Sequence, residues 1–135
     1  MFTLHPRLAA DTAPLADWPL CRVLLMNDAQ YPWLILVPRR AEVAEITELS
    51  PEDRAILMEE IALASTRLRT HTNPERVNIA ALGNVVPQLH VHVAARFTTD
   101  AAWPKPIWGA VPPCPYQPAE LARQVEAWQG VLRRP

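Results

Sequence analysis

The sequence predicts an α+β domain in which helices cover one antiparallel sheet. Three observations carry this prediction: two pairs of short apolar segments, a long helical segment between the pairs, and a second helical segment near the end of the chain. With 135 residues, of which 50% are hydrophobic, the chain suits one core. We therefore expect a single domain over residues 1–135, built on an antiparallel sheet with one long central helix and a C-terminal helix.

The first two expected strands are residues 21–28, CRVLLMND, and residues 33–39, WLILVPR. Both are rich in aliphatic side chains of the kind that strands bury. The connection AQYP between them, residues 29–32, is short enough for a hairpin. We therefore expect these two strands to be antiparallel neighbours.

The long central helix is expected to begin after Ser50 and to end before Pro74. Ser50 is a favourable N-cap, Pro51 suits the first helical position, and the acidic residues that follow favour the positive N-terminus of the helix. An apolar stripe recurs at helical spacing and consists of Leu57, Ile61, Ala64 and Leu68. This stripe is expected to pack on the sheet.

Two further strands are expected at residues 76–82 and 88–96, separated by the turn-like segment GNVVP. The second helix is expected over about residues 118–133, with Leu121, Val125, Trp128 and Leu132 on one face. The segment before it, PKPIWGAVPPCPYQP, is too rich in proline for regular helix or central strand. Its apolar side chains indicate an ordered loop rather than a linker.

Composition and charge exclude several classes of function. The net charge of -1 offers no broad cationic surface for nucleic acid. The apolar runs are far shorter than the roughly 20 residues of a membrane-spanning helix, and the first residues lack the pattern of a signal peptide. The two cysteines show no CxxC spacing, which is typical of a reduced protein. We therefore expect a cytoplasmic protein that partners with neither membranes nor nucleic acid.

Polar and apolar side chains alternate in QLHVHVA, residues 88–94. Because alternate side chains of a strand share a face, Gln88, His90 and His92 are expected to form a polar ridge. Three interpretations stay open: an exposed polar face, a metal site built on two imidazoles, and nucleophilic catalysis in which a neutral imidazole attacks phosphorus. The metal site needs a third ligand, for which the sequence offers only distant histidines and carboxylates.

The same stretch resembles the signature of the histidine triad (HIT) superfamily, His-x-His-x-His followed by two apolar residues. Here Gln88 stands in place of the first histidine. Further segments resemble a bacterial subgroup of that superfamily, namely PWLILVPRR, LSPEDRAILMEEI, VNIAALGN and DAAWPKPIWG. The resemblance covers most of the chain and implies the HIT-like α+β fold.

The resemblance also implies a nucleotide hydrolase or transferase with a catalytic site of His90, His92 and Gln88. The middle histidine of the motif, here His90, is the nucleophile of the family and would form a nucleotidyl-histidine intermediate. His92 would bind a phosphate oxygen. Asn78 and Asn84 match positions where relatives carry polar side chains near the phosphate, although an edge strand and a turn explain these two asparagines equally well.

Substrate, cofactor and assembly follow from the same resemblance. It implies cleavage of a nucleoside phosphoester, phosphoanhydride or phosphoramidate, with diadenosine polyphosphates as one candidate, and it implies neither a metal nor another cofactor. Asn27 or Asp28 is expected to bind the ribose. Trp103 or Trp108 is expected to stack on the base, with anchoring of the proline-rich loop as the structural alternative. Members of the family pair their sheets, which implies a homodimer.

Two departures from the family pattern bear on activity. Gln88 donates and accepts hydrogen bonds but cannot titrate near neutral pH as a histidine does. Many relatives also carry a histidine where Trp33 stands in this sequence. We expect an active enzyme because the nucleophile is retained. The alternative is a catalytically weak or inactive nucleotide-binding protein.

Overall fold

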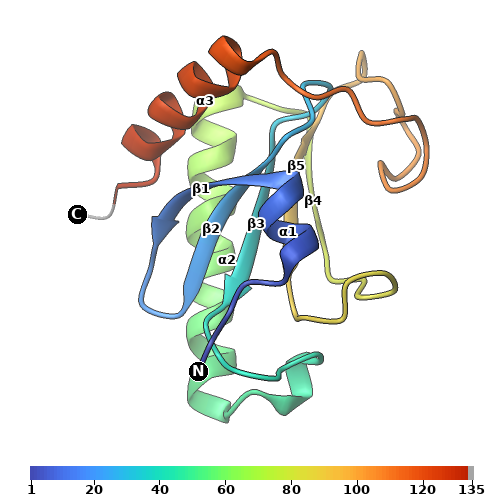
Figure 1. Ribbon diagram of the computed structural model, residues 1–135. Helices are drawn as coiled ribbons and strands as arrows, with labels where there is room; N and C mark the ends of the chain where they lie inside the picture. The colour runs from blue at the N-terminus through green and yellow to red at the C-terminus, as the bar shows by residue number, and fades with distance from the viewer. Residues whose placement is uncertain (134–135) are drawn as a thin grey trace.

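The structure, a computed structural model, describes residues 1–133 and contains one five-stranded antiparallel sheet (Figure 1). The strands are β1 (Thr12–Asp17), β2 (Cys21–Met26), β3 (Trp33–Pro38), β4 (Arg76–Ala80) and β5 (Val91–Arg96). Their order in the sheet is β1-β2-β3-β5-β4, and every neighbouring pair is antiparallel. The α+β class is thus confirmed, as is the antiparallel pairing of the two strands expected at residues 21–28 and 33–39.

The helices lie on both faces of this sheet. They are α1 (Pro6–Asp11), the short 3-10 helix η1 (Ile46–Glu48), α2 (Pro51–Thr72) and α3 (Pro118–Val131). Helix α2 packs against β3 and β5, and α3 packs against β1. Figure 1 shows α2 behind the sheet and the short α1 in front of it. The long central helix and the C-terminal helix are confirmed, and no helix within residues 1–133 is long and apolar enough to cross a membrane.

Helix α2 begins and ends at the residues that its local sequence favours. The Ser50 hydroxyl accepts a hydrogen bond from the backbone N–H of Asp53 at 3.1 Å, and Pro51 occupies the first turn. At the other end Asn73 adopts the left-handed conformation with φ of 51° and donates its N–H to the carbonyl of Arg69. The expected apolar stripe is buried against the sheet.

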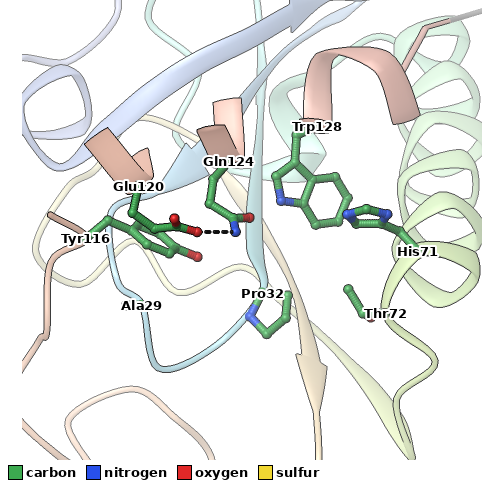
Figure 2. Close-up of a pocket in the computed structure, with 8 residues that line it drawn as sticks. All are labelled: Ala29, Pro32, His71, Thr72, Tyr116, Glu120, Gln124 and Trp128. Carbon is green, nitrogen blue, oxygen red and sulfur yellow. Dashed lines mark hydrogen bonds between the residues drawn. The ribbon is translucent and has the colours of Figure 1, made fainter. Parts of the chain in front are cut away.

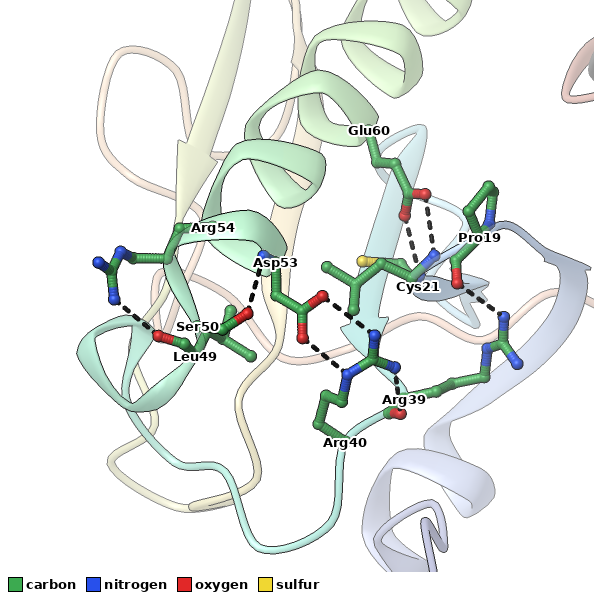
Figure 3. Close-up of polar contacts among 10 residues, drawn as sticks. Pro19, Cys21, Arg39, Arg40, Leu49, Ser50, Asp53, Arg54 and Glu60 are labelled. Atoms are coloured by element: carbon green, nitrogen blue, oxygen red, sulfur yellow. Dashed lines mark hydrogen bonds and ion pairs between the residues drawn. The ribbon is translucent and has the colours of Figure 1, made fainter.

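A buried carboxylate ties α2 to the start of β2 (Figure 3). The two oxygens of Glu60 accept the backbone N–H groups of Leu20 at 3.0 Å and Cys21 at 2.8 Å. Burial, together with the charge of this carboxylate, raises the pKa of the Cys21 thiol. On the exposed side of the same region, Arg40 pairs with Asp53 at 2.7 Å. The N-terminal half of α2 is thus joined to β2 and to the segment after β3.

Both faces of the sheet are buried. Alternate residues of β3 and β5 point toward α2 and α3, where Leu34, Leu36 and Val93 belong to one hydrophobic cluster. Ile35 and Ala94 point the other way, into a second cluster that α1 and the proline-rich loop complete. The expectation that this loop is ordered is confirmed, because its apolar side chains anchor it on the second face. His92 lies on the same face as Ile35, its partner in the β3–β5 pairing.

Three elements were not expected from the sequence, namely α1, β1 and η1, and the largest boundary difference is at the start of β5. Residues 6–17 form α1 and β1, although TAPLAD is poor in β-branched residues, because β1 obtains its order from pairing with β2. As the edge strand, β1 also tolerates Pro14. The strand expected from residue 88 begins at Val91, since the N–H of Leu89 bonds to the carbonyl of Val43 in a loop rather than to a neighbouring strand.

Candidate functional site

A cavity of about 690 Å³ lies on the second face of the sheet, and His90 and His92 line it. We call it the histidine cavity. Its walls come from α1, the ends of β2 and β5, the loop between β2 and β3, the loop over residues 82–86, and the proline-rich loop. The elements on the two sides of the motif in sequence, together with the N-terminal helix, therefore meet around the two histidines.

His90 directly precedes β5, and a hydrogen bond to the backbone of Gln88 orients its ring. Its Nδ1 atom lies 2.7 Å from the carbonyl oxygen of Gln88, and only 7% of the residue is exposed. A carbonyl oxygen can only accept, so Nδ1 of His90 carries the proton. In the neutral ring Nε2 then keeps the lone pair, and no protein group within residues 1–133 makes a hydrogen bond to it. His90 thus presents the lone pair of Nε2 to the cavity.

His92 has the opposite arrangement of protons. The indole Nε1 of Trp33 donates to Nδ1 of His92 at 3.0 Å, which leaves the ring proton on Nε2. Burial, and secondly the charge of His90, lower the pKa of His92 to about 4. The two imidazole centroids are 4.9 Å apart. The pair therefore combines one ring nitrogen with a lone pair and one neutral ring with an N–H donor.

Gln88 binds the N-terminal segment. Its Nε2 donates to the carbonyl of Thr3 at 2.9 Å, and its Oε1 accepts the N–H of His5 at 2.8 Å. These two bonds fix the residues immediately before α1, whose Arg7 and Asp11 line the histidine cavity. The Gln88 side chain does not line that cavity itself. In a regular strand Gln88 would share a face with the two histidines. Residues 88–90 lie outside β5, however, so this alternation does not hold for Gln88.

Four of the six expected substrate-binding residues line the histidine cavity: Asn27, Asp28, Asn84 and Trp108. Asn27 accepts the N–H of Tyr116 at 2.9 Å, and one oxygen of the buried Asp28 accepts the N–H of Gln30 at 3.0 Å. Trp108 stands edge-on to His92, with ring centroids 5.3 Å apart. The structure thus brings these four side chains together with the histidines.

Asn78 and Trp103 lie in a different region, around a buried ion pair. Arg96 and Asp100 approach to 2.8 Å, and their side chains are almost completely buried. The amide oxygen of Asn78 accepts from Arg96 at 2.8 Å, and the guanidinium lies 5.7 Å from the ring centroid of Trp103. Both residues therefore support the end of β5 and do not line the histidine cavity.

Two features of the site were not expected from the sequence: the cavity residues of α1 and the hydrogen bond between Trp33 and His92. Arg7 and Asp11 line the cavity from an unexpected helix, where they form an exposed pair at 3.6 Å. A local signal was present: His5 caps this helix by accepting from the N–H of Arg7, and Pro6 follows it. No local sequence pattern could indicate the contact between Trp33 and His92, because the two residues are 59 positions apart in the sequence.

The residues that the structure describes include no group of three or more His, Cys, Asp or Glu side chains arranged to hold a metal ion. The third ligand that the metal interpretation of the sequence requires is therefore not found beside His90 and His92 within residues 1–133. Their ring nitrogens have the separate hydrogen-bond arrangements described above.

A second cavity, of about 500 Å³, lies between the end of α2 and α3 (Figure 2). We call it the helix-end cavity, and it is lined by Ala29, Pro32, His71, Thr72, Tyr116, Glu120, Gln124 and Trp128. The ring of His71 packs edge-on to Trp128 with centroids 4.7 Å apart, and Gln124 donates to Glu120 at 3.1 Å. Two of its polar side chains, Gln124 and Glu120, thus bond to each other, and the His71 ring packs on an aromatic neighbour.

Comparisons with known proteins give a consistent result. A family model described as HIT domain matches residues 8–99. Crystal structures of histidine triad proteins are similar over nearly the whole chain. The one from Bradyrhizobium japonicum is 46% identical with a TM-score of 0.93 and covers 98% of each chain. The one from Marinobacter aquaeolei is 46% identical with a TM-score of 0.94 and covers 98% of this chain and 96% of the other. The one from Sinorhizobium meliloti is 44% identical with a TM-score of 0.91 and covers 96% of each. No curated protein matches.

Proposed function

This chain belongs to the HIT family, and on that premise we propose that it cleaves a nucleoside phosphate bond by covalent catalysis at His90. Members of the family are generally nucleotide hydrolases or transferases. The observation that carries the proposal is the pairing of two neighbouring imidazoles with opposite proton placement. His90 offers a lone pair on Nε2, and His92 offers an N–H donor on Nε2, at the same cavity.

The proposed reaction has two displacements. In the first, Nε2 of His90 forms a bond to the α-phosphorus while the bond from phosphorus to the leaving group breaks, and the leaving group takes a proton from water or solvent. In the second, a water oxygen bonds to the same phosphorus and gives up a proton to solvent, the phosphorus–nitrogen bond breaks with its electron pair returning to Nε2 of His90, and a nucleoside monophosphate departs. His92 donates to a phosphate oxygen in both steps and so stabilises the charge that develops there.

The substrate we propose is a nucleoside phosphoester, phosphoanhydride or phosphoramidate, with diadenosine polyphosphates as one candidate class. The buried carboxylate of Asp28 has one oxygen occupied by Gln30, which leaves the other for a ribose hydroxyl. Asn27 lies beside it at the cavity wall, and Asn84 and Trp108 line the same space. A cavity of about 690 Å³ has the size of an ordinary small-molecule site.

A nucleotide-binding protein with negligible turnover is the second candidate function. The observation that favours it is the engagement of Gln88 with Thr3 and His5, because this side chain cannot titrate and is turned toward the N-terminal segment. On this alternative the cavity would still bind a nucleotide, but proton transfer from water alone, without a titrating side chain, would be too slow for turnover. The two candidates differ in turnover but agree on binding.

We further propose that the chain forms a homodimer through β4. This strand lies at the edge of the sheet, so one row of its backbone groups has no strand neighbour within residues 1–133. Ile79 on this strand is 49% exposed, and Val85 in the following loop is 70% exposed. An Ile79→Lys variant should shift the mass in sedimentation equilibrium from two chains to one. A wild-type protein that sediments as one chain contradicts the proposal.

The test of function combines turnover with binding. Diadenosine polyphosphate and an adenylate ester are offered to wild type and to His90→Ala, with release of adenosine monophosphate followed by chromatography and binding followed by calorimetry. We expect release by the wild type alone and binding by both proteins. Binding without release by the wild type would contradict the hydrolase and favour the binding protein. Absence of both would contradict both candidates for adenine nucleotides.

A further inference from the structure

Trp33 begins β3 and lies against His92, and its contacts give it a definite role. We propose that Trp33 is a positioning residue that fixes the ring proton of His92 on Nε2, so that this ring presents an N–H donor to the ligand. The carrying observation is the hydrogen bond of 3.0 Å from Trp33 Nε1 to His92 Nδ1. Both side chains line the histidine cavity, so the contact lies at the site.

Strand register brings the two residues together. In the antiparallel pairing of β3 with β5, Trp33 is opposite Ala94, and Ile35 is opposite His92. Trp33 and His92 are therefore diagonal neighbours on the same face, a spacing that long aromatic side chains can bridge. Their ring centroids are 5.7 Å apart at an interplanar angle of 48°, so the two rings meet through the hydrogen bond rather than by stacking.

Two further aromatic rings hold the indole of Trp33 in place. Tyr31 contacts it edge-on with centroids 6.2 Å apart, and Trp108 contacts it at an interplanar angle of 89° with centroids 6.5 Å apart. Trp33 itself is only 8% exposed. Rotation of the indole away from His92 would require these neighbours to move, so the donor remains aimed at Nδ1.

The chemistry of the two rings decides which nitrogen of His92 carries the proton. An indole N–H is a donor only, and a neutral imidazole has one donor and one acceptor nitrogen. Nδ1 must therefore be the acceptor, and the ring must be neutral, because a charged imidazole would set N–H against N–H. Burial, and secondly the charge of His90, lower the pKa of His92 to about 4, which is consistent with a neutral ring. The other charged groups lining the cavity are Arg7, Asp11 and Asp28.

The position of the ring proton decides whether His92 can donate a hydrogen bond to the phosphate. With the proton on Nε2, His92 donates to a phosphate oxygen; with the proton on Nδ1, it would turn a lone pair toward the same oxygen. Within residues 1–133 only the hydrogen bond from Trp33 fixes the proton of the His92 ring on Nε2. Loss of a buried neutral hydrogen bond of this kind should lower kcat by about tenfold. KM should change less, because a charge that develops during reaction depends on this donor more than ground-state binding does.

The catalytic meaning of this inference rests on the proposed function, but the proton itself can be located without any turnover. Protein labelled with ¹⁵N-histidine is studied at neutral pH by two-bond proton–nitrogen correlation, which distinguishes the tautomers. We expect one species in the wild type, with His92 protonated on Nε2. A wild type protonated on Nδ1 would overturn the inference, whatever any variant does.

Two matched variants complete the experiment. Trp33→Phe keeps an aromatic ring but removes the donor, and we expect the Nδ1 tautomer of His92 to appear together with the fall in kcat. Trp128→Phe makes the same change at an indole that contacts a different histidine, His71, and should leave the tautomer of His92 unchanged. An unchanged tautomer in Trp33→Phe overturns the inference. A wild type without turnover but with the Nε2 tautomer contradicts the proposed function alone.

Discussion

The histidine cavity and the helix-end cavity have comparable volumes, about 690 Å³ and about 500 Å³, and each sets a histidine beside a tryptophan. In the helix-end cavity the His71 ring packs against Trp128, and no hydrogen bond from residues 1–133 fixes either of its ring nitrogens. In the histidine cavity one nitrogen of each histidine is bonded to the protein and the other is left for a ligand. A histidine in a cavity is therefore informative about function mainly where a hydrogen bond on one ring nitrogen fixes whether the other presents a proton or a lone pair.

The largest effect that separates the two cavities is expected from their histidines. His90→Ala should lower the rate of nucleoside monophosphate release by at least about a thousandfold, because it removes the nucleophile. His71→Ala should leave this rate within about twofold, since His71 only packs on Trp128. Steady-state release assays on both variants check the contrast. Equal losses in the two variants would contradict the assignment of the active cavity.

The next largest effect concerns pH and stability. The pKa of His92 is lowered from 6.5 to about 4, so the unfolded chain binds a proton there more readily than the folded one. The free energy of unfolding should therefore fall as pH decreases from about 6.5 to about 4, by about 3 kcal/mol in total, and this contribution is fully present above pH 6.5. Urea unfolding at several pH values measures it.

His92→Asn is the control for this pH dependence, because it removes the titrating ring. Its unfolding free energy should lose most of the slope between about pH 6.5 and pH 4. Asp17, whose pKa the hydrogen bond from Arg22 lowers, loses its stabilising effect only below its ordinary value of 3.8 and so falls outside this window. Glu120, whose pKa is lowered by hydrogen bonds from Gln124 and Arg123, begins to lose its effect below its ordinary value of 4.5, and that small slope at the acid end should remain in His92→Asn. A slope that persists in His92→Asn would show that another group causes it.

A smaller effect is expected from Gln88, which links the motif to the wall of the histidine cavity. Gln88→Ala removes two hydrogen bonds to the segment before α1 and should lower the free energy of unfolding by about 1–3 kcal/mol. Because α1 carries cavity residues, KM should rise while kcat falls less. Chemical unfolding and steady-state kinetics measure the two changes.

Gln124→Ala is the matched control, since it removes a glutamine from the helix-end cavity. It should leave KM unchanged. If Gln88→Ala lowers kcat as strongly as His90→Ala with KM unchanged, then Gln88 acts on the reacting atoms, as the sequence analysis expects, and not through the N-terminal segment.

The smallest effect is expected from metal chelation. The proposed displacement uses only imidazole nitrogens and water, so treatment with EDTA followed by gel filtration should change kcat by less than about twofold. Metal analysis by plasma mass spectrometry before and after treatment accompanies the assay. Activity that is lost with the chelator and restored by a divalent ion would contradict a metal-independent step.

Local and periodic signals made much of the fold predictable. The Ser50 cap, Pro51 and the apolar stripe define α2 without reference to the rest of the chain. Alternation along residues 88–94 correctly separates Val91 and Val93 from His92, although the face that carries His92 is buried as well. By contrast, β1 depends on pairing with β2, and its own sequence carries little strand signal.

The site was less predictable, because its remaining details depend on contacts between residues far apart in sequence. The motif itself indicated that His90 and His92 lie together. No local pattern shows that Trp33 donates to His92 or that Gln88 turns to Thr3. Asn78 was expected at the substrate but is bonded to Arg96, an interaction that only the pairing of β4 with β5 brings about.

Covalent catalysis at His90 is tested most directly by intact-protein mass spectrometry at neutral pH, seconds after mixing with diadenosine polyphosphate or an adenylate ester. We expect the wild type to gain the mass of one nucleotidyl group, with fragmentation placing it on His90, and we expect His90→Ala to gain none. The adduct should decay as nucleoside monophosphate appears. Monophosphate release by the wild type without any adduct, or an equal adduct on His90→Ala, would contradict the nucleotidyl-histidine mechanism.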